Sequence, residues 1–296
     1  MSFSTEVKNE LVNLPILSEC CRHALAYGLL LFGRSFSNAS VSFAAENRTV
    51  LGLYASCISE ITGTKPEYTD RSGKMAIVSV KSVMERREIL EAFGHSAGEL
   101  SLRINRANLA DECCFASFIR GAFLSCGTVS SPEKNYHLEF VVPFLKLSND
   151  LFALLQELGF SPKHILRKSC HVIYFKDSEN IEDLLTRMGA TKSTLKLIGV
   201  KIDKDMRNHV NRRVNFETAN IDRSVQAGSL QLEAIRKIDK ARGLDTLPKG
   251  LKEIACMRME HPEASLFELE ELFEGRLSRS GINHRLKRLV QIAEEI

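Results

Sequence analysis

The stretch CCRHALAYGLLLF, residues 20–32, returns 93 residues later as CCFASFIRGAFLSC, residues 113–126. Both copies open on two adjacent cysteines, are largely apolar and carry one central glycine, Gly28 or Gly121. Their length and apolar content predict a buried helix in each case. Because glycine has no Cβ, two helices can approach closely where their glycines meet. We therefore expect these two helices to pack together at a pseudo-two-fold axis.

The duplication extends beyond these helices, with an offset that settles at 96 residues, as Gly63 and Gly159 or Pro66 and Pro162 illustrate. Alternating β-branched and aromatic residues, helical periodicity and turn residues predict the same order of elements in each copy. The first copy gives Cys20–Phe32, Val41–Ala45, Thr49–Thr62, Lys65–Thr69, Ala76–Val80 and Val83–Phe93. The second gives Cys113–Cys126, His137–Val142, Ser148–Leu158, Lys163–Arg167, His171–Phe175 and Ile181–Met188.

Turn residues close each copy. Arg71-Ser72-Gly73 and Lys168-Ser169 mark the hinge between the last two strands, and Gly94 and Gly189 end the last helix. The resulting fold class is α+β, with a duplicated αββαββα pseudo-dimer. We assign residues 1–97 to the first repeat and residues 98–205 to the second.

The last 32 residues, Ser265–Ile296, predict two short helices around a tight turn. Ser265 and Glu268 have the spacing of a capping box at the start of the first helix. Gly275 suits a left-handed turn residue, and Ser278 suits the cap of the second helix. The apolar stripes are Leu266, Leu269, Leu272 and Phe273 in the first helix, and Ile282, Leu286, Leu289 and Ala293 in the second.

The polar face of the second helix is basic, because no acid occurs between Glu274 and Glu294. Such a face suits a DNA major groove, and the alternative is a solvated surface helix. Residues expected to face base edges are Arg279, Ser280, Asn283 and Lys287, with His284 beside them. His284 has a second interpretation as a structural histidine. Residues expected to face phosphates are Arg276, Arg285 and Arg288.

An arginine-bearing polar segment separates the repeats from this region. We expect residues 206–224 to be a linker, either solvated or lined with phosphate contacts from Arg212 and Arg213. A helix over Ser224–Arg242 follows, ended by Gly243, and another over Lys249–Met259. The stripe of the first is Leu230, Ala234, Ile238 and Ala241. Residues 225–296 thus form an all-α helix-turn-helix domain of about four helices.

Composition narrows the class of protein further. The chain of 296 residues suits two or three domains, and a net charge of +3 is too small to establish a nucleic-acid partner. Residues 1–17 lack the apolar core of a targeting peptide, and no run is long enough to span a membrane, so we expect a cytoplasmic, nucleoid-associated protein. The eight cysteines have no zinc-ligand spacing. We expect buried reduced thiols, with no metal and no cofactor.

The segment IRGAFLSCG, residues 119–127, resembles the LAGLIDADG motif of homing endonucleases. Those enzymes hold divalent metal with an acid just before the last glycine of the motif, and Cys126 stands there in this chain. The equivalent in the first repeat is Phe32 or Gly33. Since metal-dependent phosphodiester hydrolysis needs hard oxygen ligands, we expect no catalytic residue and no enzyme activity.

The whole chain resembles the WhiA family of sporulation and cell-division regulators. The resemblance rests on SFSTEVKNEL (2–11), NRRVNFETANIDR (211–223) and SRSGINHRLKRL (278–289). It implies sequence-specific binding to double-stranded DNA, transcription regulation, and roles in cell division, sporulation and chromosome segregation. Two other functions remain open: a metal-dependent DNA endonuclease, and an adaptor docking RNA polymerase, a sigma factor or another regulator. We expect a monomer, because the internal repeat already supplies the pseudo-symmetry of a dimer.

Overall fold

A computed structural model of the chain describes residues 2–16, 18–71, 75–99 and 101–296. Two compact units divide it, one ending at Asp203 and the other running from Lys204 to Ile296. Each unit has its own hydrophobic core. Ser72 and Gly73 of the predicted hinge lie outside the described residues.

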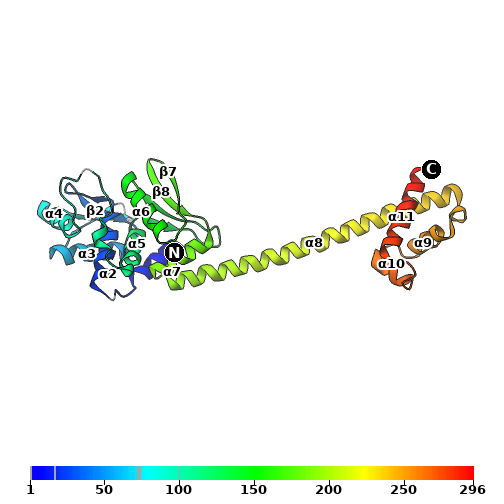
Figure 1. The fold of residues 1–296 in the computed structure, drawn as a ribbon, viewed down its shortest axis with the longest axis horizontal. Helices are drawn as coiled ribbons and strands as arrows, with labels where there is room; N and C mark the ends of the chain where they lie inside the picture. Colours follow the sequence, from blue (N-terminus) through cyan, green and yellow to red (C-terminus); the bar gives the residue numbers. More distant parts are fainter. Residues whose placement is uncertain (1, 17, 72–74, 100) are drawn as a thin grey trace. The chain divides into compact units, whose positions relative to one another are not determined.

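Two parallel helices form the centre of the first unit, α2 (Glu19–Leu31) and α5 (Glu112–Cys126) (Figure 1). A methyl group on Gly28 would collide with the carbonyl oxygen of Phe118, and one on Gly121 with the carbonyl oxygen of Leu25. The contact between the two helices is therefore one of backbone against backbone. This confirms the predicted close approach of the two glycine-bearing helices.

Each repeat contributes one four-stranded antiparallel sheet. The first contains β1 (Ser35–Phe36), β2 (Val41–Ala45), β3 (Glu67–Arg71) and β4 (Met75–Val80), in the order β1-β2-β4-β3. The second contains β5 (Gly127–Val129), β6 (Leu138–Val142), β7 (Lys163–Arg167) and β8 (Cys170–Phe175), in the order β5-β6-β8-β7. The short β1 and β5, absent from the predicted ranges, complete the αββαββα order and confirm the fold class.

Helices of the first unit pack against both sheets. The first sheet contacts α2, α3 (Arg48–Thr62) and α4 (Val83–Ala92). The second contacts α5, α6 (Leu145–Glu157) and α7 (Ser178–Met188), and its strand β5 also contacts the N-terminal helix α1 (Phe3–Val12). The predicted helix ends hold within three residues, because left-handed glycines follow α3 and α7 and polar caps precede them. A short 3-10 helix, η1 (Arg106–Asn108), lies between α4 and α5.

An N-terminal helix, α1 (Phe3–Val12), also belongs to this unit, although no periodicity argument predicted it. Its buried face contains Phe3, Val7 and Leu11. The carboxylate of Glu10 accepts hydrogen bonds from the backbone N–H groups of Lys192 and Ser193, at 2.7 and 2.9 Å. Glu10 therefore caps the start of α8, a helix that follows α7.

Helix α8 is continuous over Thr191–Arg242, so the predicted start at Ser224 was wrong. Residues 206–224, expected as a linker, are helical and solvent-exposed. The physical reason is cooperativity: a helix anchored at both ends needs no new nucleus to continue through a segment without a packing face. The predicted stripe was also partly wrong, because Leu230 and Ala241 are exposed while Gln231 and Ile235 are buried.

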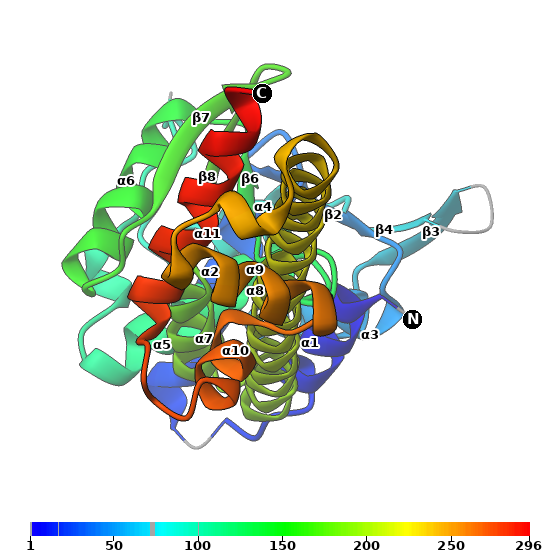
Figure 2. The same ribbon diagram turned by 90° about the vertical axis from the view of Figure 1, so that its right-hand side faces the viewer.

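The second unit gathers three helices around the C-terminal end of α8 (Figures 1 and 2). They are α9 (Lys249–Glu260), α10 (Leu266–Leu272) and α11 (Arg279–Glu294), and a short 3-10 helix, η2 (Leu244–Thr246), precedes them. Gly243 ends α8 at φ +77° as predicted, and the core contains Ile235, Ile238, Ile254, Leu269 and Phe273. The predicted four-helix arrangement is confirmed over the described part of this unit.

The cysteines differ from the expectation of buried thiols. Cys57 and Cys114 are buried, five others are half-buried, and Cys113 is exposed. Cys113 is accessible because it lies in the first turn of α5, at the surface of the unit. Among the described residues, no helix combines the length and apolar character needed to cross a membrane.

Adding one methyl group at the helix contact tests its role in stability. We expect Gly28→Ala or Gly121→Ala to lower the free energy of unfolding by about 1–3 kcal/mol, because the backbones must separate. Gly52→Ala is the matched control: nothing lies near its would-be Cβ within α3, so it should raise stability by about 0.5–1 kcal/mol. All five tyrosines lie before Asp203, so denaturant titration followed by tyrosine fluorescence reports this unit. Equal effects at the three positions would contradict the account.

Candidate nucleic-acid interface

The α10–α11 pair begins with a complete capping box. The Ser265 hydroxyl accepts a hydrogen bond from the Glu268 N–H (3.2 Å), and the Glu268 carboxylate accepts one from the Ser265 N–H (2.6 Å). The Ser265 N–H, and after it the Ser265 side chain, hold the pKa of the Glu268 carboxyl below its usual value. The turn after α10 has φ +73° at Gly275, and Ser278 caps α11 by accepting from the Gly281 N–H (3.3 Å). The predicted roles of Ser265 and Ser278 as helix caps and of Gly275 as a left-handed turn residue are confirmed.

One face of α11 completes the core of the second unit. Ile282, Leu286, Leu289 and Ala293 are buried, as their helical spacing predicted. They belong to one cluster with residues of α8, α9 and α10. Because these buried residues fix the rotation of α11, its opposite face must be presented to solvent.

The structure places most of the predicted DNA-facing residues on that solvent face. Ser280, His284 and Lys287 are exposed, and Asn283 is half-buried. Their side chains make no hydrogen bond or ion pair with any residue that the structure describes. Arg288 is exposed as well, with its guanidinium 3.2 Å from the amide oxygen of Gln291. These groups are therefore available to a ligand.

Arg279 and Arg276 differ, because each lies close to an acid of a neighbouring helix. The Arg279 guanidinium is 3.1 Å from the Glu270 carboxylate and lies over the Phe267 ring. Arg276 is 3.8 Å from Glu253 and donates to the Phe273 carbonyl oxygen. The absence of acids within residues 275–293 concealed both pairings, since the acids come from α9 and α10.

Three further predicted residues have other surroundings. Arg285 is half-buried and points to α9, where it donates to the Gly250 carbonyl oxygen at 3.4 Å. Arg212 and Arg213 are exposed on α8, and Arg213 pairs with Glu217 at 2.9 Å. No described hydrogen bond or ion pair connects Arg212 or Arg213 to α10 or α11. The structure therefore brings together the residues of α11 but not all ten predicted residues.

The paired ends of α2 and α5 are the positions where a homing endonuclease would hold metal. Cys126 ends α5, and burial raises the pKa of its thiol to about 12. Lys8 of α1, which local spacing did not single out, donates to the Leu124 carbonyl oxygen at 3.0 Å. Burial lowers the pKa of Lys8 to about 8. A neutral thiol and a lysine that is mostly protonated at pH 7 occupy this end of α5, and the equivalent position after α2 is Phe32 or Gly33.

Several acids near the sheets are paired with bases. Glu139 on β6 accepts from Arg167 (2.8 Å) and lies 3.0 Å from His137. In the first sheet Asp70 pairs with Arg48 at 2.6 Å. The sheet surfaces therefore carry charges of both signs that are partly neutralised by ion pairs.

Comparison with known proteins agrees with this architecture. Residues 115–207 match the model of the WhiA LAGLIDADG-like domain, and residues 210–293 match that of the WhiA C-terminal HTH domain. A probable cell division protein WhiA from Ruminiclostridium cellulolyticum is 39% identical over 308 residues, covering 100% of this chain and 98% of the relative. Its counterpart from Clostridium tetani is 38% identical over 318 residues, again covering 100% and 98%.

A solved structure shows the same fold. The crystal structure of full-length DUF199/WhiA from Thermatoga maritima superposes with a TM-score of 0.60 at 23% identity, covering 100% of this chain and 99% of that one. Fold and site thus define a class of protein in which a LAGLIDADG-like domain is followed by a helix-turn-helix domain. Within that class, the chain belongs to the WhiA family.

Proposed function

We propose that the chain is a sequence-specific DNA-binding transcription regulator and that α11 is the helix that enters the major groove. The observation that carries this proposal is the two-sided character of α11, whose buried stripe closes the core while basic and amide side chains face solvent. A major groove about 12 Å wide accepts one α-helix, and its base edges offer partners for such side chains. Membership of a family with a C-terminal HTH domain supports the same assignment.

Position along α11 suggests a role for each residue. Arg279, Ser280 and Asn283 belong to the first turns, which contact base edges in helix-turn-helix proteins, and Lys287 follows one turn later. Asparagine pairs well with adenine, and arginine or lysine with guanine. Phosphate contacts are assigned to Arg276 and Arg288, and along α8 to Arg212 and Arg213; Arg285 would have to leave the Gly250 carbonyl oxygen to make one.

The first unit, on this proposal, has no nuclease activity. Mg²⁺ needs oxygen ligands to bind and to activate water, and Cys126 offers a thiol where a carboxylate would be required. The amino group of Lys8 at the same end of α5 further disfavours a divalent cation. The paired charges of the sheets favour a scaffold or protein-docking role, because phosphate binding needs an excess of cations.

The biological setting follows from the family. The relatives are named as probable cell division proteins, which supports a role in cell division. We extend the proposal to sporulation and chromosome segregation, to a monomer at the nucleoid in the cytoplasm, and to RNA polymerase, a sigma factor or another regulator as protein partner.

Two substitutions separate base reading from phosphate binding. The test uses a duplex recovered by genome-wide crosslinking and footprinting. Asn283→Ala should weaken binding to it by about 1–3 kcal/mol, roughly 5- to 150-fold, and should leave the affinity for a scrambled duplex unchanged. Arg288→Ala should weaken both duplexes and lower the salt slope by about 1, because one phosphate contact is lost. The control is Lys134→Ala, which removes an exposed charge from the first unit. If Arg279, Asn283 and Lys287 could all become alanine without loss of affinity, the adaptor function would replace this proposal.

Removing the acid that pairs with Arg279 should strengthen DNA binding. We expect Glu270→Gln to tighten binding by up to about fivefold, because a partly exposed ion pair contributes about 0.2–1 kcal/mol that DNA no longer has to displace. Glu271→Gln changes the same charge one residue away on α10 and serves as the control. Titrations at several salt concentrations measure both. Identical gains from the two variants would mean that net charge, and not the Arg279 pair, sets the affinity.

A plasmid assay tests the absence of nuclease activity. Supercoiled DNA incubated with the full-length chain and either Mg²⁺ or Mn²⁺ should remain supercoiled, because no carboxylate occupies positions 32, 33 or 126. Gel electrophoresis over a range of protein concentrations gives the readout. Saturable, metal-dependent cleavage would establish the endonuclease alternative.

A further inference from the structure

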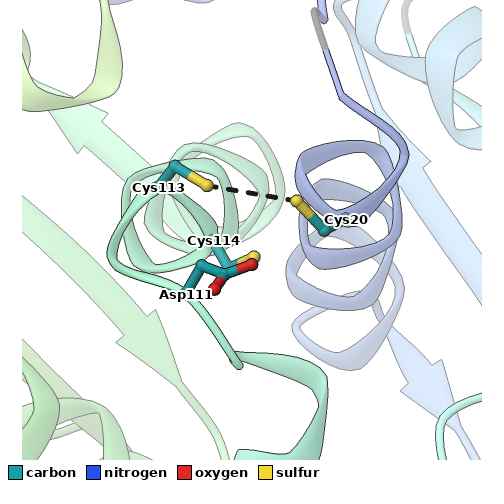
Figure 3. A group of neighbouring side chains, drawn as sticks. All are labelled: Cys20, Asp111, Cys113 and Cys114. Atoms are coloured by element: carbon teal, nitrogen blue, oxygen red, sulfur yellow. Dashed lines mark hydrogen bonds between the residues drawn. The ribbon is translucent and has the colours of Figure 1, made fainter.

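The first turns of α2 and α5 bring four potential metal ligands together. Cys20 and Cys113 are each the second residue of their helix, and their Sγ atoms are 4.0 Å apart. Their side chains point toward each other from the two helices, with Asp111 and Cys114 beside them (Figure 3). The four ligand atoms all lie within 4.8 Å of one another. A separation of 93 residues between the cysteine pairs explains why no local spacing motif revealed the group.

We propose that Cys20, Cys113, Cys114 and Asp111 bind one Zn²⁺ ion in a tetrahedral site. A Zn–S distance of about 2.3 Å gives tetrahedral S···S edges of about 3.8 Å, close to the distance between Cys20 and Cys113. A disulfide bond would require the same two sulfur atoms to move about 2 Å closer together. Three thiolates and one carboxylate suit Zn²⁺, whereas Mg²⁺ and Ca²⁺ require oxygen ligands.

The role of Asp111 supports a ligand at this point. Asp111 is the N-cap residue of α5, yet its carboxylate makes no capping hydrogen bond. Its counterpart Ser18 at α2 behaves normally and accepts from the Cys21 N–H at 3.3 Å. The Asp111 carboxylate is thus placed among the thiols without serving its own helix. Because Cys113 is exposed, an ion can reach the group from solvent.

The position of the group at two helix N-termini favours metal-bound thiolates. Two helix N-termini converge on the group, and each carries a partial positive charge that offsets the negative charge of the ligands. Zinc binding would release three protons, one from each coordinating thiol, as the three Zn–S bonds form.

Such an ion would join the two repeats, because its ligands come from both central helices. Cys20 belongs to α2 of the first repeat. Asp111 is the N-cap of α5 in the second repeat, and Cys113 and Cys114 lie in the first turn of that helix. Since a site of this kind exists only in the folded chain, the ion should raise the stability of the first unit.

Metal titration of the reduced, full-length chain tests the site. After treatment with a chelator, the protein should take up one Zn²⁺ per chain, and Co²⁺ should give thiolate-to-metal charge-transfer absorption. Cys20→Ser and Cys113→Ser should each weaken Zn²⁺ binding by at least about 100-fold, the upper end of the loss known for residues that only orient a ligand. Cys170→Ser and Cys256→Ser are matched controls, since both cysteines are half-buried and lie elsewhere. Melting curves without metal establish that the variants fold.

Three results would overturn the proposal. The first is no stoichiometric zinc uptake by the reduced wild-type chain. The second is wild-type affinity in Cys20→Ser and Cys113→Ser. The third is a Cys20–Cys113 disulfide, formed on mild oxidation and detected by mass spectrometry, in a chain that takes up no zinc when reduced. That last result would identify the group as a redox pair.

Discussion

The backbone contact between α2 and α5 at Gly28 and Gly121 is the constraint on which the rest of the first unit depends. The two helices run parallel: Cys20 meets Cys113 at their starts, and the Ser125 hydroxyl donates to the Leu29 carbonyl oxygen (2.5 Å) near their ends. Because no side chain separates them, whatever each helix carries at either end lies beside its counterpart. This contact therefore brings the thiols of Cys20 and Cys113 together at the start of the two helices. At their other end it brings together the positions that correspond to the metal site of homing endonucleases.

The second unit depends on a different balance, between a buried stripe and an exposed basic face on one helix. The core positions of α11 leave its rotation no freedom, so the first-turn polar residues must face outward. Glu270 pairs with Arg279 in the unbound protein, which lowers the free charge of that face. To bind DNA, Arg279 would have to exchange the Glu270 carboxylate for a phosphate or a base edge. Such an exchange favours partners whose acceptors match the geometry of the guanidinium over partners that are only negatively charged.

Much of this could be predicted because it is local. The repeat located the strands, and Ser265, Gly275 and Ser278 located α10 and α11, since caps and turns depend on neighbours in sequence. The continuity of α8 could not be predicted, because residues 206–224 have no packed face to produce a periodic pattern. The pairs Arg279–Glu270 and Cys20–Cys113 depend on tertiary contacts that no spacing encodes. Glu270 beside Arg279, and Lys8 at the end of α5, were missed for the same reason, since both lie at their sites only through tertiary contacts.

The central claim is that α11, and not the sheets of the first unit, contacts DNA. Photo-crosslinking of the full-length chain to its recovered duplex, followed by mass spectrometry of the attached peptides, tests this most directly. The account predicts crosslinks within Arg279–Arg288 and none within β3, β4, β7 or β8. Crosslinks confined to those strands, with α11 unmodified, would contradict it.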